Sequence, residues 1–108
     1  MRAIVLVLAL AAQSESLRVM GTVGCLVEEE GKWFLTDATE PVPGDDIDRN
    51  LDPAAQGELR FAVIGTVSEF SVPDHAGHKV RLKGLILDAE PVDRLQLTSL
   101  KHVAPTCP

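Results

Sequence analysis

The sequence predicts a small all-β domain, and three observations support this prediction. The chain of 108 residues is 45% hydrophobic and 24% charged, a composition typical of one globular domain and not of a disordered chain. Only 4% of the residues are aromatic, so the core must consist mainly of Val, Leu and Ile, which favour strands. Residues 79–83 alternate between basic and apolar side chains, and alternation of this kind is the pattern of a half-buried strand. We therefore expect a five-stranded barrel, with a small β-sandwich as the alternative.

The first segment, residues 1–16, is predicted to be a secretory signal peptide. Met1 and Arg2 precede the apolar run 3–12, and a polar segment with small residues at its border follows this run. The run is about ten residues long, whereas a membrane-spanning helix needs about 20. We therefore expect a secreted or periplasmic protein with one domain at residues 17–108 and no membrane span. The alternative is a buried N-terminal strand or helix.

Residues 17–37 are predicted to form the first hairpin. A strand that starts near Leu17 is followed by a turn at residues 28–31 and by a second strand at residues 32–37. Glycines at positions 21 and 24 allow the first strand to bend. The face of this strand that we expect to point to the core carries Val19, Val23, Cys25 and Val27.

The segment 38–57 is predicted to be a long acidic connection on the surface, because it holds three prolines and few apolar residues. Part of it resembles the start of a calcium loop, since side chains with oxygen atoms alternate along it. An EF-hand loop, however, needs Gly and Glu where this chain has Leu51 and Gly57. We therefore expect a solvated or helix-capping segment and not a calcium site. The candidate calcium ligands are Asp46, Asp48, Asn50 and Asp52.

The third strand is predicted at residues 58–67, and a short helical turn is predicted at residues 74–77. Asp74 would cap this turn, and Gly77 would end it just before the fourth strand. The residues of the third strand that alternate on one apolar face are Leu59, Phe61, Val63 and Val67.

The fourth strand starts at Lys79, and the fifth is predicted at residues 95–103. In the fourth strand Gly84 takes an inward position, where a strand bends or is approached closely. Its inward apolar residues are Val80, Leu82 and Ile86, while Lys79, Arg81 and Lys83 face water. In the fifth strand one face carries Leu95, Leu97, Ser99 and Val103, and the other carries Gln96, Thr98, Leu100 and His102.

Cys25 and Cys107 are predicted to form a disulfide, because an exported chain meets an oxidising compartment. The bond would close a loop of about 80 residues. The alternative is a reactive thiol, for which only a histidine, at position 75, 78 or 102, could serve as the base. His75 and His78 could also form part of a metal site, but no third or fourth ligand is identifiable. We therefore expect them to be turn histidines.

The predicted elements describe the partly open OB-type barrel, with five strands and a helical turn between the third and the fourth. The sequence also resembles a family of small exported bacterial proteins of unknown function with an OB-like barrel. The segments that carry the resemblance are 20–26 (Met-Gly-Thr-Val-Gly-Cys-Leu), 33–37 (Trp-Phe-Leu-Thr-Asp), 76–84 (Ala-Gly-His-Lys-Val-Arg-Leu-Lys-Gly) and the ending 97–107. The resemblance covers most of the expected mature chain and implies export and the barrel, but no catalytic residue. The acidic connection is longer than that of the family.

The function predicted from these observations is that of a non-enzymatic envelope or secreted module, which binds a small ligand or an envelope protein and needs no cofactor. A net charge of −6 argues against a nucleic-acid partner. The basic stripe of Lys79, Arg81 and Lys83 is the candidate ligand face, although it lacks the aromatic platforms of single-strand binders. The alternative is a Cys- or metal-dependent enzyme, but no nucleophile, base and orienting acid stand at recognisable spacing.

Overall fold

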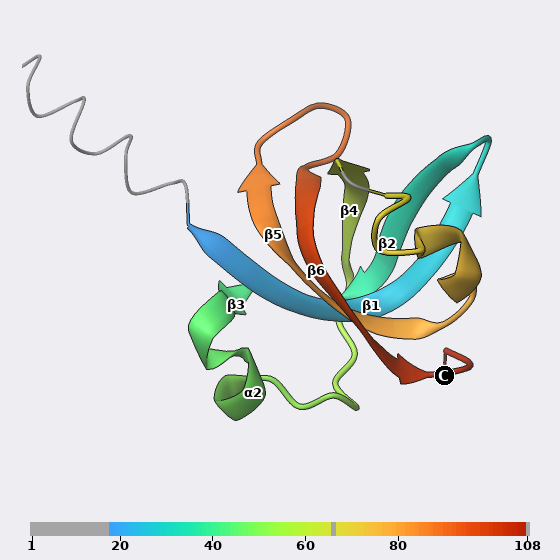
Figure 1. The fold of residues 1–108 in the computed structure, drawn as a ribbon. Helices are drawn as coiled ribbons and strands as arrows, with labels where there is room; N and C mark the ends of the chain where they lie inside the picture. Colours follow the sequence, from blue (N-terminus) through green and yellow to red (C-terminus); the bar gives the residue numbers. More distant parts are fainter. Residues whose placement is uncertain (1–17, 66, 108) are drawn as a thin grey trace, which may run out of the picture.

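The computed structural model describes residues 18–65 and 67–107 (Figure 1). The predicted signal peptide, residues 1–16, lies outside the described residues.

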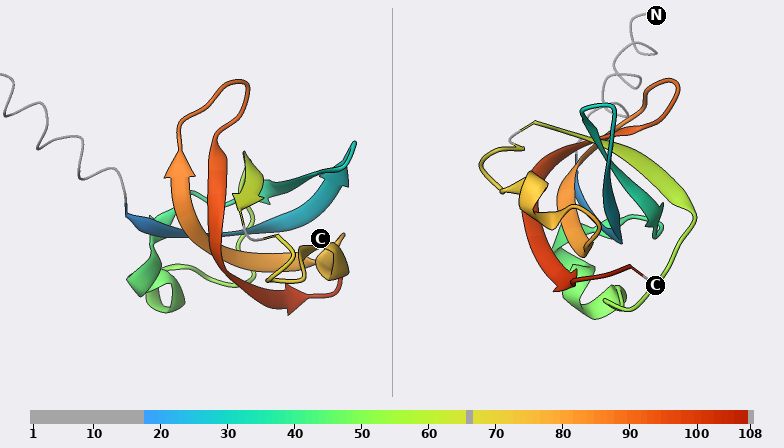
Figure 2. Two further views of the ribbon diagram at one scale, coloured as in Figure 1. Left: turned by 45° about the horizontal axis from the view of Figure 1, so that its top comes forward. Right: turned by 90° about the vertical axis from the view of Figure 1, so that its right-hand side faces the viewer.

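The described residues form one sheet that curls into a barrel (Figures 1 and 2). Its five long strands pair in the order β1–β2–β4–β6–β5–β1, and the short β3 lies beside β1. The β4–β6 pair is parallel, and the other pairs are antiparallel. The predicted all-β fold with a five-stranded barrel is thus confirmed. The strands are β1 (Val19–Glu29), β2 (Lys32–Ala38), β3 (Val42–Pro43), β4 (Leu59–Gly65), β5 (Lys79–Leu87) and β6 (Arg94–Ala104).

The ring closes because β1 is long and changes partner along its length. Its first half pairs with β5 from Val19 to Cys25, and its second half pairs with β2 from Cys25 to Glu29. The β1–β2 turn consists of Glu30 and Gly31, whose φ angles are 54° and 81°. Positive φ at both central residues matches the twist of the flanking strands, so this two-residue turn fixes the register of the hairpin.

The main core lies inside the barrel and consists almost entirely of aliphatic side chains. Leu26, Leu35 and Leu82 are each completely buried there. The predicted core face of β1 is therefore only partly correct, because Leu26 points to the barrel interior and Val19 is 44% exposed. The buried residues of this cluster are Leu26, Leu35, Ala38, Phe61, Val63, Val72, Val80, Leu82, Leu95 and Leu97.

A second, smaller core forms where the acidic segment packs against β1. Val23 contacts Ile47 and Leu51, which are 1% and 8% exposed, and Val42 covers them. The prediction that residues 38–57 are a solvated connection is therefore wrong for these apolar positions. Val42 lies on β3, Ile47 is the first residue of the one-turn helix α2 (Ile47–Asn50), and Leu51 directly follows this helix. The 3₁₀ turn η1 (Gly44–Asp46) joins β3 to α2. Gly21 makes the contact possible, because a Cβ atom at this position would overlap Ile47.

Buried hydrogen bonds hold the start of the acidic segment on β1. The Thr22 hydroxyl donates to the Thr39 carbonyl oxygen at 2.7 Å, and the Val23 amide donates to the Thr39 hydroxyl at 3.1 Å. The Thr39 amide donates to the Val23 carbonyl oxygen at 2.9 Å. These polar groups can be buried because they satisfy one another.

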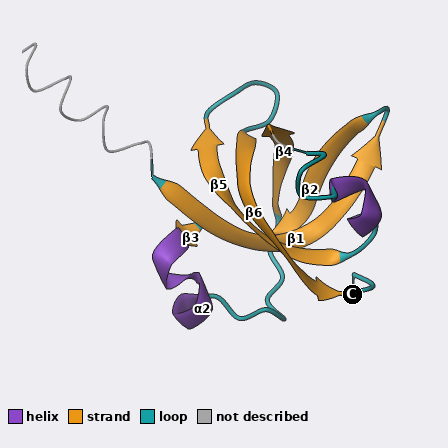
Figure 3. Cartoon of the chain, in the orientation of Figure 1, coloured by secondary structure: helices purple, strands orange, loops and turns teal. Residues whose placement is uncertain are grey.

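The predicted helical turn between the third and fourth long strands is present as the 3₁₀ helix η2 (Val72–His75). Figure 3 shows η2 and α2 at separate places on the barrel. The helix η2 starts earlier than predicted, because Pro73 lies in its first turn. The fixed φ angle and the missing amide proton of proline are tolerated at this position of a helix. Asp74 therefore lies inside the first turn, and Ser71 takes the capping position.

Strand β6 bulges where it passes β5, and this changes which of its residues point inward. Lys83 pairs with Ser99, but the next residue of β5, Gly84, pairs with Leu97. Thr98 is therefore the extra residue of a β-bulge and has no partner residue in the β5–β6 register. Beyond the bulge the alternation shifts by one, and Leu100 packs against the main core instead of pointing outward as predicted. The predicted inward place of Gly84 is confirmed, since a Cβ atom there would overlap the Gln96 carbonyl oxygen.

Candidate functional site

A groove follows strands β2 and β4 on the barrel and has a volume of about 620 Å³. We call it the β2–β4 groove. One end is formed by the β1–β2 turn, and one side by the connection between β5 and β6. Its size falls within the range of about 300–1,000 Å³ that is usual for small-molecule sites. Its lining is mostly apolar and includes Trp33, Phe34, Ala62, Ile64, Pro91 and Val92.

The pairing of β2 with β4 explains the shape of this groove. Phe34 stands opposite Ala62, and Trp33 stands opposite Val63, so each large ring faces a smaller side chain. Sequence reasoning placed Trp33 and Phe34 correctly on a strand but did not identify the groove. The groove depends on the register of β2 against β4 and on the position of the β5–β6 connection, and neither is visible in a single sequence.

An ion pair covers one side of the Phe34 ring. The Arg60 guanidinium carbon lies 4.0 Å from the ring centroid, and Arg60 donates two hydrogen bonds to Glu29, at 2.7 and 3.1 Å. The hydrogen bond from Arg60 lowers the pKa of Glu29. The charged side chains that line the groove itself are Lys32, Glu90 and Arg94.

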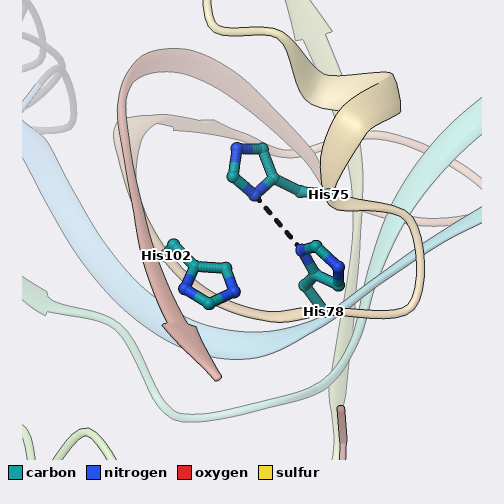
Figure 4. A group of neighbouring side chains, drawn as sticks. All are labelled: His75, His78 and His102. Atoms are coloured by element: carbon teal, nitrogen blue, oxygen red, sulfur yellow. Dashed lines mark hydrogen bonds between the residues drawn. The ribbon is translucent and has the colours of Figure 1, made fainter. Parts of the chain in front are cut away.

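Three histidines meet at the junction of η2, β5 and β6 (Figure 4). We call them the histidine cluster, which consists of His75, His78 and His102. The Nδ1 atoms of His75 and His78 are 3.4 Å apart, and the ring centroids of His78 and His102 are 5.0 Å apart. His75 and His78, which were expected to be turn histidines, are thus joined by a third imidazole. Sequence reasoning missed this because His102 is distant in the chain and is brought close only by the β5–β6 pairing.

The predicted disulfide between Cys25 and Cys107 is confirmed. No free cysteine is present in the part of the chain that the structure describes, so the alternative of a reactive Cys25 thiol is not supported. The bond lies in a cleft of about 180 Å³ that is also lined by Asp37, Gly57 and Lys79.

The candidate ligand face on β5 is less open than predicted. Lys79 was expected to face water but is only 6% exposed, because it lies in the cleft beside the disulfide and residues 55–57. Arg81 and Lys83 are half-buried on the same side of the strand. The three residues therefore do not form one continuous exposed basic stripe.

Of the candidate calcium ligands, Asp46 is the last residue of η1, Asp48 and Asn50 belong to α2, and Asp52 lies beyond this helix. Asp46 and Arg49 form an ion pair at 3.6 Å, and Asp52 accepts a hydrogen bond from the Ala54 amide at 2.9 Å. The side chains of Asp48 and Asn50 lie outside the described ones.

We therefore expect the acidic segment to bind calcium weakly or not at all. Calorimetric titration of chelator-treated protein with Ca²⁺ should show no saturable site. A stoichiometric site with a dissociation constant below about 10 µM, within the range of calcium sensors, would contradict this prediction.

Comparisons with models of known protein families, with curated proteins and with solved structures found no match. Within residues 18–65 and 67–107, no helix is long and apolar enough to cross a membrane. The function must therefore be argued from the geometry of the barrel itself.

Proposed function

We propose that the chain is an exported, non-enzymatic binding module of the OB type, which holds a small and mostly apolar ligand in the β2–β4 groove. The observation that carries this proposal is the position of the groove. OB-type barrels bind ligands across their second and third strands, between the loops that join strands one to two and four to five. The β2–β4 groove is lined by the corresponding strands and by both corresponding loops.

The strand order supports assignment to the OB type. When the short β3 is set aside, the five long strands follow the order one, two, three, five, four and back to one. A helical turn joins the third to the fourth long strand, as in a partly open Greek-key barrel of this type.

Export is supported by the disulfide, because such bonds persist in oxidising compartments and are rare in the cytosol. The order of basic, apolar and polar residues at the start of the sequence supports the same conclusion. A periplasmic or extracellular module would meet small ligands or envelope proteins.

The lining of the groove favours binding over catalysis. None of the described residues that line it is Ser, Cys or His, the types that most often act as nucleophile or base. The lining carries two cations, Lys32 and Arg94, and one anion, Glu90. The best ligand is therefore an apolar molecule with one anionic group, whose apolar part replaces water on Ile64 and Val92.

Anilinonaphthalene sulfonate is a suitable probe, because it combines an aromatic apolar body with one sulfonate. Trp33 is the single Trp of the chain and lines the groove, so its emission reports occupancy directly. We expect saturable energy transfer from Trp33 to the dye, with a dissociation constant below about 100 µM. The folded, disulfide-bonded protein is used throughout.

Ile64→Glu is expected to weaken dye binding by at least about tenfold. The carboxylate of the introduced Glu would lose its hydration in the groove and would lie beside the like-charged sulfonate of the dye. Leu85→Glu is the matched control, since Leu85 is also half-buried on a barrel strand but lies outside the groove. Equal loss of binding in both variants, or no transfer from Trp33 in the unchanged protein, would disprove the proposal.

A further inference from the structure

We propose that His75, His78 and His102 form a binding site for a divalent transition-metal ion, with zinc as the ion that the geometry fits best. This inference goes beyond the proposed ligand groove and does not depend on it. It concerns a different part of the barrel, because the residues that line the β2–β4 groove include none of the three histidines.

The distances among the three rings suit a tetrahedral ion. One ligand atom from each histidine lies within 4.8 Å of the others. Zn–N bonds of about 2.0–2.1 Å at tetrahedral angles place nitrogen atoms about 3.3 Å apart. The Nδ1 atoms of His75 and His78 are 3.4 Å apart, which is close to the spacing of two zinc ligands.

The backbone holds two of these ligands in place before any ion binds. The Gly77 amide donates to the Leu26 carbonyl oxygen at 2.7 Å, and the Leu26 amide donates to the His78 carbonyl oxygen at 3.0 Å. Gly77 has a φ of 78°, which lets the chain turn so that His75 and His78 face each other. The His78 amide also donates to the His75 carbonyl oxygen at 2.9 Å. The turn between the two ligands is therefore tied to β1.

The third ligand is placed by the sheet. His102 stands opposite Val80 in the β5–β6 ladder. His78 lies two residues before Val80, directly before the first residue of β5. Side chains two apart on a strand point to the same face, so the ladder directs His102 toward His78. The disulfide lies beside this turn, since the Cys107 Sγ atom is 3.3 Å from the Gly77 carbonyl oxygen.

The donor set indicates the kind of ion. Imidazole nitrogen suits zinc, copper, nickel and iron, whereas calcium and magnesium prefer oxygen ligands. Three imidazoles leave one tetrahedral position open for water or for a ligand group, as in zinc sites with three protein ligands. His102 is exposed, so an ion can reach the site from solvent.

Zinc titration of the untagged, disulfide-bonded full chain tests the proposal. The chain contains three histidines in all, so a purification tag of histidines would mask the result. Calorimetry is expected to show one Zn²⁺ per chain with a dissociation constant below about 10 µM. Nuclear magnetic resonance should show that Zn²⁺ shifts all three imidazole signals, while Mg²⁺ shifts none.

His102→Gln is the sharpest variant, because its exposed side chain can change without disturbing the core. It is expected to weaken Zn²⁺ binding by at least about tenfold, since even the loss of an outer-shell partner costs about 10- to 100-fold. His75→Gln and His78→Gln should have the same effect. Ile64→Glu is the matched control, which should lose the dye but keep Zn²⁺ binding.

The proposal would be overturned by the absence of saturable Zn²⁺ binding, by unchanged affinity in His102→Gln, or by imidazole signals that do not move in the unchanged protein. Loss of Zn²⁺ binding on Asp46→Asn together with Asp52→Asn, with the histidine variants unaffected, would assign the ion to the acidic segment and would equally contradict it.

Discussion

Removal of the disulfide in a Cys25→Ala, Cys107→Ala double variant is expected to lower the free energy of unfolding by about 4 kcal/mol. The two residues are separated by 82 positions, so the bond restricts almost the whole described chain in its unfolded state. The cost of closing so long a loop grows with the logarithm of its length. Equilibrium urea denaturation of the two proteins measures the difference.

The folded structure adds to this effect at the end of the chain. Cys107 lies beyond the last residue of β6, and the bond ties it to the middle of β1. The reduced protein is the control, because reduction breaks the bond without changing the core. Reduced protein and double variant should unfold at similar urea concentrations. A double variant that lost less than about 1 kcal/mol would show that the unfolded chain gains little freedom.

The disulfide and the barrel were predictable because each depends on a strong local signal. Two cysteines near the ends of a chain with a predicted signal peptide have few alternatives to pairing with each other. In β5 the alternation of Val80 and Leu82 with basic residues gave the correct inward face, because this strand has one face in the core.

The faces of β1 and the acidic segment were not predictable, because both depend on a second layer of packing. Val23 is buried by Ile47 and Leu51 on one side of the sheet, while Leu26 is buried inside the barrel. A strand that is covered on both sides loses the simple alternation on which a sequence argument relies. Ile47 and Leu51 were surrounded by acidic residues, so they gave no clear apolar pattern of their own.

The candidate sites were the least predictable features, since each gathers residues from several strands. The Thr98 bulge shifts β6 by one position, which no periodicity argument can anticipate, and the histidine cluster depends on the resulting register. The groove likewise combines β2, β4 and a loop that follows β5. Only the pair His75 and His78 gave a signal in the sequence, through its spacing and the neighbouring Asp74.

Leu82→Ala is expected to lower the free energy of unfolding by about 3 kcal/mol, within the range of about 2–5 kcal/mol for buried Leu→Ala changes. Leu82 is completely buried in the main core, and it stands between Thr22 on β1 and Leu100 on β6. The ring of strands leaves little freedom for the walls to collapse into the space, so most of the cavity should remain. Urea denaturation with the disulfide intact measures the change.

Leu85→Ala is the control for this prediction, because it removes the same atoms from the same strand. Leu85 is half-buried and packs into neither of the two cores of the described residues. Its loss should cost less than about 1 kcal/mol, since fewer contacts disappear and no closed cavity forms. If both variants lost the same amount, the barrel interior would not be the main source of stability. A small loss in Leu82→Ala alone would show that the strands move inward to fill the space.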